Sequence, residues 1–297
     1  MAYLCLQYKS VREYCNFPIV LVGASANRID ISVAVCVGPI YVSNLLSLDL
    51  TLGFHGSNII RLARVFAALS LCRVELQNYY KVVGEMTSPQ LSCLFPSPTL
   101  VDFAMTLPKL VYRKFLSRAG QPISDILDMG NATTAMYIAT ANETEEAIVK
   151  FTPRYNKMAH ILLANAKLAP KLHFCELVVG DLHMVVMDRV SGQSVWQLQQ
   201  KKEKIPSIVL TKVTEAVRLL HEQNIVFGDL QLPNILYDES KDHVVLVNFD
   251  WPGVDRYPAT LNPSNLWDED VAPYGLMHKS HDLWQLEQWM DLCSELA

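Results

Sequence analysis

One stretch in the last third of the chain constrains its fold more than any other: His221-Glu-Gln-Asn-Ile-Val-Phe-Gly-Asp229-Leu-Gln-Leu-Pro-Asn234-Ile-Leu. An apolar helix pattern ends at its first residue, and a polar loop over 238–242 and an apolar strand over 244–247 follow it. A single Asp-x4-Asn pair says little, because both residue types are common in turns. The informative feature is the order of elements around the pair, which is helix, loop, short strand, loop and strand. The alternative interpretation is that the stretch is only an acidic surface loop.

Composition predicts a well-packed hydrophobic core and a reducing, intracellular environment. The chain has 297 residues and is 51% apolar, enough for one large or two modest domains. Its seven cysteines are odd in number and form no C-x-x-C pair. Scattered thiols suit a reducing compartment better than a disulfide scaffold or a zinc site. We therefore expect an intracellular protein, cytoplasmic or nuclear.

No segment favours a membrane. The N-terminus lacks the charged-then-apolar layout of a signal peptide. The longest uncharged apolar run, Ile31 to Leu48, is interrupted by Gly38-Pro39 and by several polar residues. Because a spanning helix needs about 20 mostly apolar residues, this run is interpreted as buried strands.

Charge divides the chain into two parts. Residues 1–120 hold 11 Lys plus Arg against 6 Asp plus Glu, a net charge of +5, whereas residues 121–297 hold 14 against 24, a net charge of −10. We expect an N-terminal segment over 1–100 and a second domain over 120–297. The basic residues of the first part form no dense stripe, which argues against nucleic-acid binding.

The N-terminal segment carries no catalytic constellation. Ile19 to Val22 and Ile31 to Val37 have the pattern of strands. Apolar residues recur at near-helical spacing over 58–80, which predicts a helix there. We expect a small α/β segment whose role the sequence leaves open.

The second part resembles the protein kinase-like superfamily, and within it the fungal kinase-like proteins. Their pattern runs valine-lysine-phenylalanine, alanine-histidine, leucine-alanine, F-G-D-L-R-x-P-N and D-F-D-W. The corresponding segments here are Val149-Lys150-Phe151, Ala159-His160, Leu163-Ala164, Phe227-Gly228-Asp229-Leu230-Gln231-Leu232-Pro233-Asn234 and Asn248-Phe249-Asp250-Trp251.

The resemblance implies an α+β, bilobal kinase-like fold. The N-lobe would cover about 120–187 and the C-lobe about 190–297, with a truncated C-lobe because the pattern stops soon after Asp282. Period-two alternation would put Lys150 on the strand face opposite Val149 and Phe151. A lysine there is either an edge-strand gatekeeper or a phosphate ligand, and the loop downstream favours the ligand.

The resemblance also implies ATP and Mg²⁺, with a role for each matching residue. Asp229 would act on the substrate hydroxyl proton. The residues implied in nucleotide binding are Lys150, Gly130 of a glycine-poor loop, and the hinge residues Met187, Asp188 and Val190. The metal would be held by Asn234 with Asn248 or Asp250, where the register with Asn248 is preferred because Phe249 then takes the packing position.

Asp282 would anchor the loop from a helix. His160 occupies the place of a glutamate that pairs with the lysine, either as a structural residue or as an ordinary helix-surface histidine.

Two departures weaken the catalytic interpretation. Gln231 replaces an arginine and Asn248 replaces an aspartate, so a cation and a carboxylate are lost where phosphate and metal would sit. We expect a weakly active phosphotransferase of the Ser/Thr protein kinase type. The alternatives are an impaired pseudokinase that acts as a protein scaffold and a small-molecule phosphotransferase. The protein substrate or partner is open.

Overall fold

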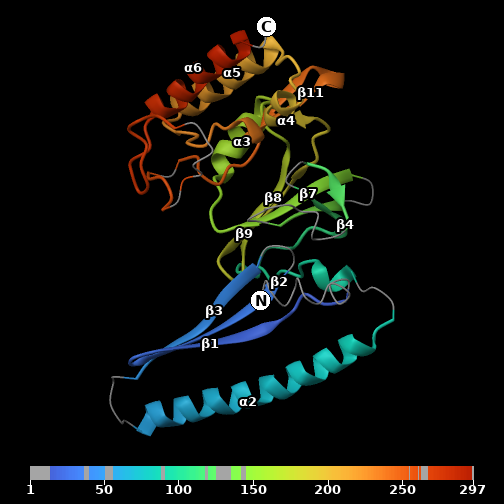
Figure 1. Ribbon diagram of the computed structural model, residues 1–297, viewed down its shortest axis with the longest axis vertical. Helices are drawn as coiled ribbons and strands as arrows, with labels where there is room; N and C mark the ends of the chain where they lie inside the picture. The colour runs from blue at the N-terminus through green and yellow to red at the C-terminus, as the bar shows by residue number, and fades with distance from the viewer. Residues whose placement is uncertain are drawn as a thin grey trace. The chain divides into compact units, whose positions relative to one another are not determined.

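The computed structural model describes residues 14–36, 40–50, 56–87, 91–117, 120–124, 135–141, 145–253, 255–259, 261 and 267–295 (Figure 1). The described residues up to Pro98, together with Ala135, form a first compact unit. Those from Thr99 to Ser124 and from Met136 onward form a second. None of the described helices is both long enough and apolar enough to cross a membrane.

The first unit is an antiparallel meander with a long helix. Strands β1 (Ile19–Ser25), β2 (Arg28–Cys36) and β3 (Ile40–Asp49) pair in the order β1-β2-β3, and helix α2 (Gly56–Glu85) and the 3-10 turn η2 (Leu91–Leu94) follow. A small core of Cys15, Phe17, Cys36 and Val83 ties the end of α2 to the sheet. The helix expected over 58–80 lies within α2, and the expected strands coincide with β1 and β2 where the structure describes them.

The second unit begins with a six-stranded antiparallel sheet of order β5-β4-β6-β7-β9-β8. Helix α3 (Lys157–Asn165) follows β7 in the chain. The strands are β4 (Leu110–Leu116), β5 (Pro122–Ile123), β6 (Met136–Ala141), β7 (Glu145–Thr152), β8 (Leu172–Val178) and β9 (Leu182–Asp188). Since β4 pairs with β6 from Leu110 onward, the sheet includes residues before 120, where the sequence placed the start of this domain.

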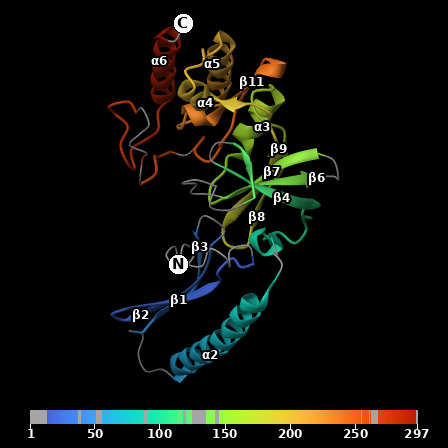
Figure 2. The same cartoon turned by 45° about the vertical axis from the view of Figure 1, so that its right-hand side comes forward.

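A mostly helical lobe follows the sheet. Its elements are β10 (Gln193–Ser194), α4 (Val195–Gln200), α5 (Ser207–Glu222), η4 (Leu232–Asn234), β11 (Ile235–Asp238), η5 (Glu239–Lys241), β12 (His243–Leu246) and α6 (Lys279–Glu295). Helices α5 and α6 lie side by side (Figure 2). Helix α5 buries Val209, Val213, Ala216, Val217 and Leu220, a single stripe at helical spacing.

One hydrophobic core joins the two lobes of this unit. It includes Ala159 and Leu163 of α3, the stripe of α5, Phe227 and Leu230 of the loop after α5, and Leu286 and Trp289 of α6. In the small sheet β10-β11-β12, strand β11 follows the loop that contains Asp229 and Asn234, and strand β12 precedes Asn248 and Asp250. The second unit therefore has the bilobal kinase-like fold expected from the sequence.

A close backbone approach fixes β10 on β11. A Cβ atom added at Gly192 would lie 2.5 Å from the carbonyl oxygen of Tyr237. Because backbone cannot move aside as a flexible side chain can, Gly192→Ala should destabilise the second unit by about 1–3 kcal/mol. All five tryptophans lie in this unit, at or after Trp196, so denaturant unfolding followed by tryptophan fluorescence reports it. The control is Gly84→Ala on α2, where no atom lies within 4 Å of an added Cβ, and it should leave that transition unchanged. Equal shifts of the transition in the two variants would contradict the close contact at Gly192.

Candidate functional site

Lys150 lies at the centre of a polar cluster in the second unit. It is placed on β7, between Met136 of β6 and Val185 of β9, and only 7% of its surface is exposed. Its Nζ donates to Asn248 Oδ1 and to Asp250 Oδ2, both at 2.7 Å. A buried ammonium needs such partners, because an uncompensated charge in the interior is costly. The lysine therefore links the sheet to the segment that follows β12.

Asp229 and Asn234 complete the cluster from the loop after α5. Asn234 Nδ2 donates to the backbone oxygen and to Oδ2 of Asp229, both at 2.8 Å. Asn248 Nδ2 lies 3.4 Å from the same Oδ2 and so joins the loop to the lysine. The structure thus brings together the lysine, the aspartate and the three predicted metal residues.

Local backbone geometry aims Asn248 into the cluster. Asn248 follows β12 and has φ 72°, in the left-handed region. Asparagine tolerates this region better than most residues with a side chain. Two residues on, Asp250 reaches the same ammonium. Asn248 and Asp250, the two residues weighed from the sequence as the metal position, therefore both contact one atom, Lys150 Nζ.

Buried Asp282 fixes the start of the loop. Its Oδ2 accepts from His221 Nε2 at 2.9 Å and from the Phe227 amide at 2.8 Å, and its Oδ1 accepts from the Gly228 amide at 2.8 Å. Gly228 has φ 76°, a conformation that favours glycine. Asp282 itself is fully buried. These contacts are those of the structural anchor expected at this position.

His160 is buried and does not lie on the helix surface. Its Nε2 donates to the Pro170 carbonyl at 2.7 Å, so its Nδ1 accepts from the Tyr155 hydroxyl at 2.6 Å. Its ring stacks on Phe249 with centroids 4.5 Å apart. Burial lowers the pKa of His160 to about 4, so the ring is neutral at pH 7. The helix-surface alternative is thus wrong, because the ring fills the core beneath α3. Its two ring nitrogens are engaged by Tyr155 and Pro170, not by Lys150.

The cluster holds two carboxylates against one ammonium. Burial raises the pKa of Asp229 to about 7, the Asn234 hydrogen bond opposes that rise, and the Asp250 charge adds to it. Asp250 Oδ1 is buried and has no hydrogen-bond partner among the described residues. An unpartnered buried carboxylate oxygen is a suitable ligand for an oxygen-liganded cation, which would need the Asn234 and Asn248 side chains or other oxygens as further ligands. The residues present therefore fit a divalent cation, with Asp250 as its charged ligand.

The predicted nucleotide-binding residues are less closely gathered. Gly130 lies outside the described residues. Met187 and Asp188 end β9, and Val190 follows them. The Asp188 carboxylate contacts His173 Nε2, and the Asp188 amide donates to the Lys171 carbonyl at 2.9 Å. The backbone at the end of β9 is thus held by a hydrogen bond, and the hydrogen bonds of Lys150 Nζ among the described residues go to Asn248 and Asp250.

Two apolar residues near Lys150, Ile148 and Ile138, were not predicted from the sequence as part of the site. Ile148 lies two residues before Lys150 on β7, and alternation puts both on one face of the sheet. There Ile148 packs with Ile138 and Met187, with Met136 and Leu172 at the rim. This apolar cluster is nearly fully buried and lies on the same face of the sheet as the Lys150 ammonium. Counting back by two from Lys150 would have identified Ile148, whereas Ile138 depends on the pairing of β6 with β7.

Parts of this chain are similar to known proteins. A family model described as RIO domain matches residues 169–254, a range that contains Asp229, Asn234 and Asp250. A curated relative, Serine/threonine-protein kinase 1 of Heliothis zea nuclear polyhedrosis virus, is 25% identical over 139 residues, 46% of this chain and 50% of the relative. The chain thus spans about half the length of that relative.

A solved structure, the Cydia pomonella Granulovirus kinase PK-1, aligns at 18% identity with a TM-score of 0.46, over 62% of this chain and 68% of that one. The matches give no support to the fungal group. The family model and the viral relative support a relation to the protein kinase-like superfamily.

Proposed function

We propose that this protein is an ATP-dependent phosphotransferase of the Ser/Thr protein kinase type, with a metal site altered by Asn248. One observation carries the proposal: Lys150, Asn248, Asp250, Asp229 and Asn234 form a single hydrogen-bonded cluster although they come from three segments of the chain. The viral relative's name supports a protein hydroxyl as acceptor. Asp229 is the catalytic residue of this proposal.

Each side chain has a chemical task suited to phosphoryl transfer. A carboxylate with a pKa near 7 can accept a hydroxyl proton at neutral pH. The Lys150 ammonium can pair with a phosphate, and the Ile138, Ile148 and Met187 patch can accept the base. Asn234 and Asp250 offer oxygens to Mg²⁺, which when bound would offset phosphate charge. These tasks are mainly positioning and charge neutralisation, the main sources of catalysis in this reaction.

The second candidate function is that of a catalytically impaired scaffold, and the existing contacts of Lys150 favour it. Lys150 Nζ is already engaged by Asp250 and Asn248 at 2.7 Å, so a phosphate must compete with an existing ion pair. Asn248 supplies no negative charge to a metal, and Gln231 no positive charge to a phosphate. The two candidates differ in one measurable property, the binding of nucleotide with Mg²⁺.

Mg²⁺ with a non-hydrolysable ATP analogue should raise the melting temperature, because a ligand that binds only the folded state stabilises it. EDTA should abolish the shift. Lys150→Met should lose it, since the ammonium that faces phosphate is gone. Lys157→Met is the matched control, because Lys157 is an exposed lysine paired with Glu176, and it should retain the shift.

Asn248→Asp restores a carboxylate at the cluster. It should raise phosphoryl transfer at least about tenfold, which corresponds to ~1.4 kcal/mol. If the wild type shows no Mg²⁺-dependent shift and Asn248→Asp gains neither binding nor turnover, the scaffold alternative is preferred over the enzyme.

Asp229→Asn should stabilise the second unit at pH 8. The folded-state pKa of about 7 lies above the ordinary value of 3.8 for an aspartate, so the fold disfavours the ionised form. Stability should therefore rise as pH falls from above 7 towards 4. The amide avoids that cost, and the gain at pH 8 should be roughly 2–4 kcal/mol and vanish near pH 4.

Tryptophan-detected unfolding at several pH values measures this gain. Glu203→Gln, at an exposed carboxylate, should show no comparable pH-dependent gain. A stability loss in Asp229→Asn at pH 8 would show that the carboxylate is structural.

A further inference from the structure

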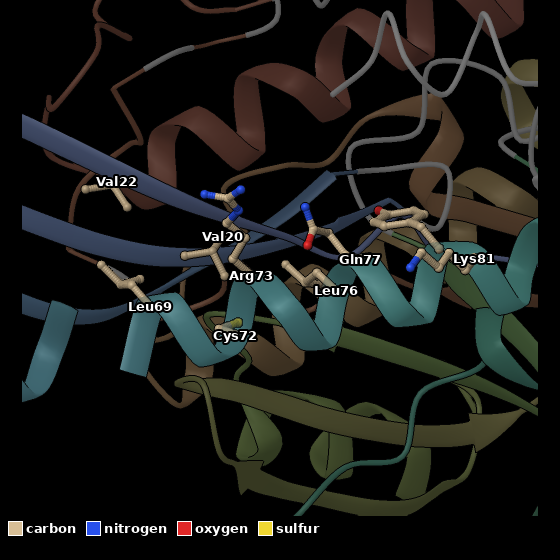
Figure 3. A pocket seen from close by; sticks show the side chains of 9 residues that line it. Val20, Val22, Leu69, Cys72, Arg73, Leu76, Gln77 and Lys81 are labelled. Carbon is tan, nitrogen blue, oxygen red and sulfur yellow. The ribbon is translucent and has the colours of Figure 1, made fainter. Parts of the chain in front are cut away.

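A groove crosses the first unit between β1 and α2 (Figure 3), with a volume of about 790 Å³. The side chains of Leu69, Arg73, Leu76 and Gln77 rise from α2 towards the strands, where Val20 and Val22 lie. Cys72, Tyr80 and Lys81 complete the lining. The groove belongs wholly to the first unit and is separate from the Lys150 cluster.

The strand that lines the groove has an open edge. Among the described strands β1 pairs only with β2, so its other edge presents backbone donors and acceptors without a strand partner. Natural edge strands are commonly protected by charged residues, proline or bulges. Here Ile19 to Val22 has none of these, and Leu21 and Val22 are 41% and 54% exposed. An apolar, unprotected edge of this kind favours pairing with another extended segment.

The helix contributes an apolar seam and a cationic row. Leu69, Cys72 and Leu76, at spacings of three and four, are half-buried and line the groove, and Leu69 and Leu76 point towards the strand. Arg73, Gln77 and Lys81 follow at intervals of four, so they share one side of the helix, and all three are exposed. No acidic side chain lines the groove. The seam would accept apolar side chains, and the row would accept carboxylates.

We propose that this groove binds an extended, acidic segment of a partner protein by strand addition to β1. The backbone edge supplies directional hydrogen bonds, and the cationic row supplies complementary charge. Arg73 and Lys81 are eight residues apart, about 12 Å along a helix. Two residues four apart in an extended strand are separated by about 13 Å and point to the same side. The segment therefore carries Glu-x-Val-x-Glu or a close equivalent. This interaction goes beyond phosphoryl transfer and does not depend on it.

A designed peptide tests the proposal on the full-length protein. The probe is a fluorescent peptide of eleven residues with threonine at odd positions and valine, glutamate, valine, glutamate and valine at even positions. Fluorescence anisotropy should show saturable binding that weakens with salt. A peptide of the same composition with glutamates three apart should bind at least tenfold more weakly, because its carboxylates then point to opposite sides. Equal binding of the two peptides would overturn the proposed register.

Charge reversal on α2 tests the cationic row. Arg73→Glu with Lys81→Glu should weaken binding of the glutamate probe at least tenfold and should allow binding of a probe with lysines in place of the glutamates. Arg61→Glu with Arg64→Glu, on the same helix but outside the groove, is the matched control and should bind as the wild type does. If both double variants bind equally, the acidic-segment proposal fails.

Backbone methylation of the probe tests strand addition without altering the protein. N-methyl groups on the alternate amides that would face β1 should abolish binding, whereas methylation of the other set should be tolerated. Equal effects of the two sets would exclude pairing with the edge. Sedimentation velocity gives the competing outcome: a concentration-dependent dimer that excludes the probe would indicate that β1 pairs with a second copy, and would overturn the proposal.

Discussion

The arrangement of the second unit depends on the contacts of the Lys150 ammonium. It is buried on a central strand and is held by Asn248 and Asp250. A charge in that position is tolerated only with partners, so the segment after β12 must lie against the sheet. Asn248 in turn contacts Asp229, which brings the loop after α5 to the same point. A single buried charge thus fixes the relation of three segments that are distant in sequence.

Neutral contacts hold α3 where the resembled family uses an ion pair. His160 stacks on Phe249, and Asn156 both caps α3 and donates through Nδ2 to the Pro252 carbonyl. The Asn156 amide also donates to the Phe249 carbonyl at 2.8 Å. Lys150 pairs with Asp250, and the His160 ring lies against Phe249 of the same segment.

The sequence predicted the order of elements and the meeting of Lys150 with Asp229, because the spacing of the motifs follows from local strands and loops. The anchor role of Asp282 stays a prediction, and the structure places its carboxylate against the Phe227 and Gly228 amides. It did not predict that β4 belongs to the sheet, since strand pairing depends on partners far away in the chain. Nor did it decide between Asn248 and Asp250: only the left-handed backbone at Asn248 shows how both can reach one ammonium. The burial of His160 was also hidden, because a histidine in a helix is compatible with either environment.

We propose that a divalent cation together with a nucleotide completes the cluster of two carboxylates and one ammonium. Proton release on binding tests this claim. Mg²⁺ and an ATP analogue are titrated calorimetrically at pH 7 in two buffers of different ionisation enthalpy, with Asp229→Asn as reference. Since the Asp229 pKa is about 7, a cation near it should expel about half a proton more from the wild type than from the variant. Equal proton release from both proteins, or no binding, would contradict the claim.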